Sequence, residues 1–412
     1  MNVTLISDGI PNISSEQANN DPWIFVNEFK RRRIKVDYIC LVNKDLNTSS
    51  IKSKKLLETF KLKFKNLNSV KTISYGKKNI LEKFTYFFLR IISNNPNYFY
   101  GSKELSKNIL EHVKKLNNKT VICFYELPIS ATSTINSEFL VFNYLGAYRK
   151  KIEIQRVINL YRKNLIKNFF NIINCLIYII KINSIYKKIL KNAKKNFCPS
   201  FDTVTDLKKI HIKNLYYSKP LSKDLGYLKK NNNSSVALLI GNLKSTFMVN
   251  SLIELSNNLI NGLKKIKKNY DFKIRIVGKF KPSSEIQKKM KFDWIKFTGW
   301  VKNSDLEYKN AKYLFTPNTY ALSARTKIIE AMSCGTIVLT YDNNIKGILH
   351  NMKNNENILI AKNSDMFIRQ FEMILKNPKL QKKISLNARK LCKKHYNPST
   401  IIKRNIDLIL EK

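Results

Sequence analysis

The amino-acid sequence predicts an α/β protein made of two Rossmann-like domains. The chain opens with an apolar strand (residues 2–7), a polar loop, an amphipathic helix (22–32) and a second strand (34–42). The same alternation of strands and helices starts again at residue 236. The run at 336–341 is short and rich in β-branched residues, as in parallel strands that are buried on both faces.

Two carboxylates follow predicted strands of the first half. Asp8 comes at the end of the first strand, and Glu126 falls at the carboxyl end of the apolar run 120–128. Open α/β sheets bind their ligands at this edge. We therefore expect Asp8 and Glu126 near a ligand, with a turn or helix cap as the alternative role for Asp8.

Segments 81–93 and 151–195 are expected to be helical and combine Phe, Ile, Leu and Tyr with Lys and Arg. One interpretation is that their apolar faces build the core of the first domain. The other is that basic amphipathic helices bind an anionic membrane surface. The uncharged run from Asn168 to Ile180 is shorter than the ~20 residues that a membrane span needs.

The segment 313–341 predicts a strand, a polar loop, a helix and a strand. Four polar residues gather at the start of its helix, where free backbone N–H groups and the helix dipole favour an anion. These residues are Ser323, Arg325, Thr326 and Lys327. Glu330 follows one turn later, where a carboxylate can accept hydrogen bonds from a diol such as ribose. A phosphate site beside a ribose site outlines a nucleotide.

Residues 325–340, RTKIIEAMSCGTIVLT, resemble the donor-binding segment of GT-B glycosyltransferases, especially family 4 (group 1) and its variant relatives. The family pattern places one Glu eight positions before a second Glu, which is followed by Ala-Met and, further on, Gly. Glu330 matches the second Glu, whereas Leu322 stands at the place of the first. Arg325 and Lys327 are similar to the basic residues of the variant subgroup.

The resemblance implies the GT-B architecture, in which two Rossmann-like domains face a central cleft. Residues 1–219 would form the acceptor-binding domain, and residues 220–395 would bind the nucleotide-sugar. Residues 396–412 resemble the family's C-terminal helix, which crosses back to the first domain.

The resemblance also extends the set of donor-binding residues. Gly241 and Lys244 stand where the family directs residues toward the donor phosphates, and Trp300 matches a turn near the nucleotide base. Gly278 ends a strand, where a small residue lets a ligand approach closely. A solvated lysine is the alternative for Lys244, and a partly buried core residue is the alternative for Trp300.

The activity that the resemblance implies is that of a hexosyltransferase-like enzyme. It would move a sugar from a nucleotide-sugar to a hydroxyl of a saccharide or lipid-linked acceptor, in bacterial surface polysaccharide or lipopolysaccharide synthesis. Asp8 and Glu126 are the two candidates for the catalytic base. The sequence has no D-x-D motif, so we expect no metal and no cofactor, with basic side chains and a helix N-terminus stabilising the leaving diphosphate.

The chain is extremely basic, with 75 Lys and Arg against 29 Asp and Glu and a net charge of +46. Most of the basic residues are lysines, which is consistent with codon bias and solvated faces. The functional interpretation is attraction to nucleotide phosphates or an anionic membrane. No nucleic-acid module is visible, so we expect no nucleic-acid partner. A non-catalytic scaffold of the same fold and a basic nucleic-acid binder remain the alternatives.

Six scattered cysteines form no C-x-x-C motif, and the four histidines form no H-x-x-x-H pair. We expect the cysteines to be buried free thiols in a reducing compartment. The first residues lead directly into a strand without a signal peptide. The predicted location is the cytoplasm, with peripheral attachment to the cytoplasmic face of a membrane as an option.

Overall fold

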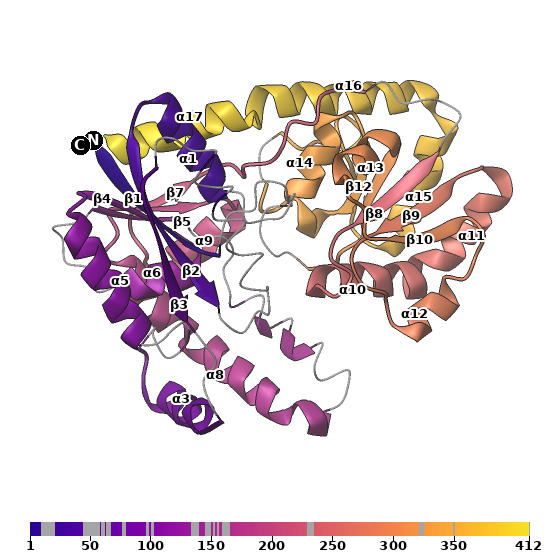
Figure 1. Ribbon diagram of the computed structural model, residues 1–412. Helices are drawn as coiled ribbons and strands as arrows, with labels where there is room; N and C mark the ends of the chain where they lie inside the picture. The colour runs from indigo at the N-terminus through magenta and orange to yellow at the C-terminus, as the bar shows by residue number, and fades with distance from the viewer. Residues whose placement is uncertain are drawn as a thin grey trace. The chain divides into compact units, whose positions relative to one another are not determined.

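The computed structural model divides into two compact units (Figure 1). Unit 1 contains Met1–Pro199, Thr203–Ser218 and Ile402–Lys412, and unit 2 contains Ser200–Asp202 and Lys219–Ile401. The residues described are 1–9, 21–43, 58, 62, 67–75, 80–95, 99, 103–132, 140–144, 150, 153–154, 156–158, 165–228, 235–320, 325–348 and 351–411.

Unit 1 is built on a seven-stranded sheet in the order β3-β2-β1-β4-β5-β6-β7. Every neighbouring pair is parallel. The strands are β1 (Asn2–Asp8), β2 (Lys35–Asn43), β3 (Leu67–Tyr75), β4 (Thr120–Phe124), β5 (Leu140–Tyr144), β6 (Lys195–Cys198) and β7 (Leu215–Tyr217). The order reverses between β1 and β4, which makes this the point where such sheets bind ligands.

The described helices of unit 1 connect these strands, as Figure 1 shows. They are α1 (Asp21–Arg31), α3 (Ile80–Ile92), α5 (Lys103–Leu116), α6 (Glu126–Thr132), α8 (Leu165–Leu190) and α9 (Phe201–Lys209). The C-terminal helix α17 (Pro398–Leu410) belongs to unit 1 from Ile402 onward. Arg32 Nη1 donates to Asp407 Oδ1 over 2.6 Å, and Asn405 Nδ2 donates to Ser218 Oγ over 2.6 Å.

Helix α8 has two different halves. Ile182, Ile185, Tyr186 and Ile189 in its second half are buried in the core of unit 1. The first half carries several exposed apolar side chains. The helix continues beyond the uncharged run of the sequence. Its segment Asn168–Leu190 is therefore long and apolar enough to cross a membrane, judged by length and composition only. In the apolar 18-residue stretch of this segment, 33% is buried.

Unit 2 has a six-stranded parallel sheet in the order β10-β9-β8-β11-β12-β13. Its strands are β8 (Val236–Ile240), β9 (Lys273–Val277), β10 (Ile295–Gly299), β11 (Tyr313–Thr316), β12 (Ile337–Tyr341) and β13 (Leu359–Ala361). Its helices are α10 (Thr246–Glu254), α11 (Ile260–Asn269), α12 (Ser284–Lys289), α13 (Ser304–Asn310), α14 (Thr326–Ser333), α15 (Ser364–Lys376) and α16 (Pro378–His395).

The predicted helix in residues 246–266 contains a π-helical turn at Leu255–Leu259. Directly before this turn, Glu254 is buried and accepts hydrogen bonds from Tyr341 Oη (2.6 Å), Ser364 Oγ (2.7 Å) and Asn258 Nδ2 (2.6 Å). A buried carboxylate is tolerated when several donors satisfy it. Glu254 therefore ties α10 to β12 and to the start of α15.

All six cysteines are buried and free of disulfides, as predicted. Burial raises the pKa of the Cys123 and Cys198 thiols to about 12. These side chains act as small apolar residues of the core.

The carboxyl ends of β8 and β9 come unusually close together. A Cβ atom on Gly278 would lie 1.8 Å from the backbone oxygen of Gly241, which no side chain tolerates. The neighbouring backbone by itself therefore requires glycine at this position, and the ligand approach that the sequence suggested stays a prediction. A Cβ on Gly241 would meet Lys327 Nζ at 3.1 Å, so this glycine leaves room for the lysine.

We predict that Gly278→Ala lowers the free energy of unfolding by about 3 kcal/mol, because the methyl group overlaps the Gly241 backbone. Gly299→Ala is the matched control. Gly299 has a φ of +80° but nothing within 4 Å of its Cβ position, so only backbone strain of about 1 kcal/mol is expected there. Thermal unfolding measures both variants, and equal midpoints would contradict the close approach.

Candidate functional site

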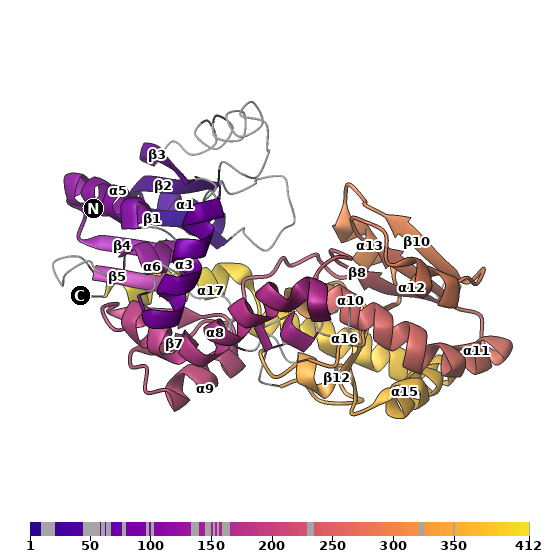
Figure 2. The ribbon, with the colours of Figure 1, turned by 90° about the horizontal axis from the view of Figure 1, so that it is seen from below.

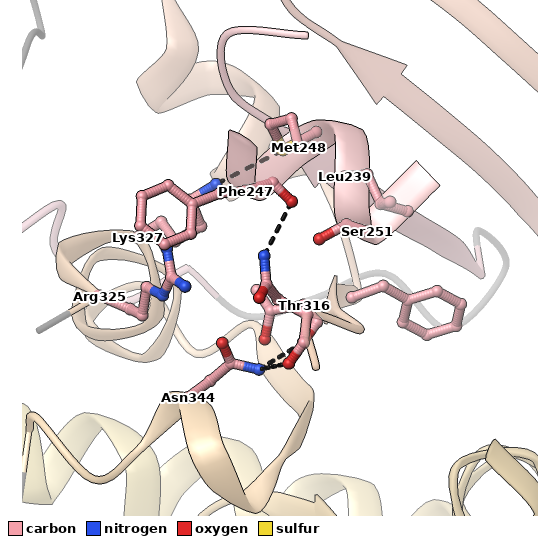
Figure 3. A pocket seen from close by; sticks show the side chains of 10 residues that line it. Leu239, Phe247, Met248, Ser251, Thr316, Arg325, Lys327 and Asn344 are labelled. Carbon is pink, nitrogen blue, oxygen red and sulfur yellow. Dashed lines mark hydrogen bonds between the residues drawn. The ribbon is translucent and has the colours of Figure 1, made fainter. Parts of the chain in front are cut away.

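A pocket lies in unit 2 at the carboxyl ends of β8 and β11, the neighbouring strands at which the sheet order reverses. The hollow measures about 300 Å³ when the open solvent at its mouth is included. This is the position where open α/β sheets bind ligands. The pocket is lined by Leu239, Phe247, Met248, Ser251, Phe315, Thr316, Asn318, Arg325, Lys327 and Asn344 (Figure 3).

Arg325, directly before α14, is one of two cations in this pocket. Its side chain is buried, with 8% of the residue exposed. The guanidinium carbon lies 3.7 Å from the centre of the Phe247 ring, and Nη2 donates to the Tyr320 carbonyl over 3.4 Å. Burial lowers the pKa of Arg325 to about 9, although the charge of Asp202 acts in the opposite direction.

Lys327 is the second cation and extends toward α10 (Figure 3). Its Nζ donates to the Ile240 carbonyl over 2.6 Å and lies 3.7 Å from Met248 Sδ. Burial and the charge of Arg325 lower the pKa of Lys327 to about 8, and the charge of Glu330 opposes both effects.

No carboxylate among the described residues forms an ion pair with Arg325 or Lys327. A buried charge without a partner of opposite sign is costly. Two such charges beside each other in an open pocket indicate an anion-binding site.

The start of α14 adds to this positive potential. Arg325 is the N-cap residue, yet no side chain caps the first turn, and Thr326 at the first helical position is exposed. The free N–H groups and the dipole of this helix end favour negative charge. The predicted cluster of Arg325, Thr326 and Lys327 is thus assembled at the helix start, whereas Ser323 lies outside the described residues.

Glu330 lies one turn further along α14, outside the lining of the pocket. The side chain is half-buried and hydrogen-bonded to Tyr308. Burial raises the pKa of Glu330 to about 7, despite the Tyr308 hydrogen bond and the charge of Lys223. The ionised carboxylate would gain from hydroxyl donors, which a diol supplies.

The sequence did not single out Thr316 or Asn344. The Oγ1 atom of Thr316 and the Oδ1 atom of Asn344 are buried and have no hydrogen-bond partner in the described part of the chain. Asn344 Nδ2 donates to the carbonyls of Thr316 (3.0 Å) and Asn318 (2.8 Å), which fixes the side chain. The sequence signal that could have identified Thr316 and Asn344 is their place at or just after the ends of β11 and β12.

Lys244 and Trp300, two further predicted donor-binding residues, also lie outside the lining of the pocket. Lys244 is exposed, and its Nζ lies 4.3 Å from the centre of the Phe280 ring. Trp300 is 69% exposed. Lys244 therefore matches the alternative role of a solvated lysine. Trp300 is neither a core residue nor part of the wall of this pocket.

In unit 1, Asp8 ends β1 beside β4, where the order of that sheet reverses. Tyr75 Oη donates to Asp8 Oδ1 over 2.9 Å, and burial raises the pKa of Asp8 above its ordinary value. Glu126 begins α6, but its side chain is outside the described part. Between β4 and α6, Tyr125 has a φ of +70°, a strained conformation of the kind that often occurs at functional sites.

Comparison with known proteins agrees with this geometry. Residues 227–391 match the family described as glycosyl transferases group 1. No curated protein sequence matches the chain.

Solved structures resemble nearly the whole chain. A sucrose-phosphate synthase from Thermosynechococcus elongatus has a TM-score of 0.66 at 14% identity, covering 99% of this chain and 98% of its own. HepE of Anabaena in complex with UDP has a TM-score of 0.65 at 10% identity, with 99% of each chain covered. WaaG, a glycosyltransferase involved in lipopolysaccharide biosynthesis, has a TM-score of 0.61 at 13% identity, with both chains fully covered.

The two Rossmann-like sheets and these structural neighbours establish the GT-B fold. The chain therefore has the GT-B fold, and its residues 227–391, which contain the pocket, match the group 1 glycosyltransferase family.

Proposed function

We propose that the enzyme transfers a sugar from a nucleotide-sugar whose diphosphate binds between Arg325, Lys327 and the start of α14. The observation that carries this proposal is a pair of cations at the switch point of the unit 2 sheet, Arg325 buried and Lys327 half-buried, with which no described carboxylate forms an ion pair. Glu330, one turn along α14, would accept hydrogen bonds from the ribose hydroxyls. HepE, a structural neighbour, is in complex with UDP.

In the proposed reaction, an acceptor hydroxyl attacks the anomeric carbon of the sugar. A new C–O bond forms, and the bond between that carbon and the diphosphate oxygen breaks. The negative charge that develops on the diphosphate is stabilised by the two cations and the α14 amides, without a metal ion. The acceptor proton passes to a base from unit 1, for which Asp8 and Glu126 are the candidates. A raised pKa suits Asp8 to this role.

The acceptor would be a saccharide or a lipid-linked saccharide in bacterial surface polysaccharide or lipopolysaccharide synthesis. WaaG, of the same fold, takes part in lipopolysaccharide synthesis. Unit 1 would bind this acceptor at the cytoplasmic face of a membrane.

Thermal stabilisation by a set of nucleotide-sugars tests the proposal, because a ligand that binds only the folded protein raises the midpoint of unfolding. The set should contain uridine, guanosine, adenosine and cytidine diphosphate sugars, each with and without EDTA. We expect one base to stand out and EDTA to leave both the shift and donor turnover unchanged. Loss of either on chelation, restored by Mg²⁺ or Mn²⁺, would overturn the metal-free mechanism.

We predict that Lys327→Met weakens binding of inorganic pyrophosphate at least tenfold, since a charge-assisted hydrogen bond is worth about 1.5–3 kcal/mol. The apo protein should lose little stability, because methionine removes an unpaired buried charge and keeps the apolar stem. Calorimetric titration measures the binding, and thermal unfolding measures the stability.

Lys312→Met is the matched control for this variant. Lys312 is another buried lysine, with 8% exposure and a pKa lowered by burial, but it precedes β11 at the opposite end of that strand. Pyrophosphate affinity should stay at the wild-type level in Lys312→Met. An equal loss in both variants would show that Lys327 has no special place in the anion site.

We predict a different pattern for Glu330→Gln. Affinity for UDP should fall about tenfold, because a neutral amide replaces a carboxylate that bonds the ribose. Affinity for pyrophosphate, which has no ribose, should not fall. Unchanged UDP affinity, or equal losses for the two ligands, would exclude the ribose contact.

A further inference from the structure

Helix α3 exposes its apolar face. Phe84, Phe88, Ile91 and Ile92 recur at positions i, i+4, i+7 and i+8, which places them on one side of the helix. Such a stripe normally packs against the core. Here these four side chains are 44–77% exposed.

The N-terminal part of α8, residues 165–180, which we call its first half, repeats this arrangement. Phe169, Leu176 and Ile180 are spaced i, i+7 and i+11 on one side of the helix, and all three are exposed, Ile180 by 78%. The sequence left two interpretations open for these helices, core packing and membrane contact. The structure assigns the second half of α8 to the core and leaves the apolar faces of α3 and early α8 uncovered.

Polar contacts join the two helices, which lie close together in unit 1 (Figures 1 and 2). Arg90 Nη1 of α3 donates to Asn174 Oδ1 of α8 over 3.3 Å. Lys181 Nζ of α8 donates to the Ser93 carbonyl over 3.3 Å, directly after α3. We name the exposed apolar residues of α3 and of the first half of α8 the α3–α8 surface.

The charge around this surface distinguishes between two possible partners, a second copy of the chain and an anionic bilayer. The two stretches that carry this surface, residues 80–92 and 165–181, contain four basic residues (Lys83, Arg90, Lys167 and Lys181) and one carboxylate (Glu82). A second copy of the chain would bring these like charges together, which opposes association. An anionic bilayer offers apolar chains to the exposed residues and negative headgroups to the lysines.

We propose that the α3–α8 surface docks the enzyme on an anionic lipid bilayer, with its aromatic and aliphatic side chains at the boundary between headgroups and acyl chains. Helix α8 does not span the bilayer, because Ile182, Ile185 and Tyr186 are fully buried in the core of unit 1. This inference is independent of the donor site in unit 2.

Sedimentation of the full chain with vesicles tests the docking. Vesicles of phosphatidylglycerol and phosphatidylethanolamine should bind the protein at low salt, and vesicles of phosphatidylcholine should bind it much less. The double variant Phe84→Glu/Phe88→Glu should partition at least about tenfold less onto the anionic vesicles. Leu306→Glu/Leu386→Glu adds the same charge at exposed apolar positions of unit 2 and should bind like the wild type.

Insertion is measured separately with Phe88→Trp. Its additional fluorescence should be quenched by brominated acyl chains, at a depth of about 5–10 Å. UDP-induced thermal stabilisation should be the same in all variants, which verifies that unit 2 is intact. Three results would overturn the proposal: equal binding by the two double variants, absence of quenching, or retention on vesicles at high salt and alkaline pH, which would indicate a spanning helix.

Discussion

Two positive charges, on buried Arg325 and half-buried Lys327, form no ion pair with any described carboxylate, and this is the constraint on which the site of unit 2 depends. Arg325 and Lys327 carry lowered pKa values because burial removes water from them. The Phe247 ring and the Ile240 carbonyl only partly replace that water. Three features make room for the Arg325 and Lys327 side chains. They are the reversal of strand order, the uncapped start of α14 and the absence of a side chain at Gly241. Such an arrangement lowers the stability of the empty protein. The binding of an anion offsets this loss of stability.

Burial, and not total charge, distinguishes functional lysines from the rest in this chain. Residues 1–218 and 219–412 each carry a net charge of +23, so the charge excess alone locates no site. Exposed lysines such as Lys244 are solvated and interact weakly with distant groups at physiological salt. Lys327 differs because its amine lies among protein atoms at a strand end. Lys181 of α8 differs in another way, since it lies next to apolar side chains that are exposed in the described part of unit 1.

The alternation of strands and helices was readable from the sequence, as were the buried face of α14 and the cluster of Arg325, Lys327 and Glu330. Strand ends and helix starts meet at one edge of a parallel sheet, so local patterns place such residues together. Local patterns do not say whether a side chain turns into the pocket, which is why Trp300 was expected there and Asn344 was not. Likewise, the spacing in α3 identified its apolar face but not whether that face is covered.

In the free enzyme, half-buried Lys327 is a cation that pairs with no described carboxylate and is available to a diphosphate. Calorimetry of UDP binding at about pH 8.5, in buffers with different ionisation enthalpies, tests this directly. Burial lowers the pKa of Lys327 to about 8, so the free lysine is largely neutral under these conditions. Glu330, with a pKa raised to about 7, is already ionised. The bound diphosphate should raise the pKa of Lys327. The protein should therefore take up a large fraction of one proton when UDP binds. Binding without proton uptake would contradict this role of Lys327.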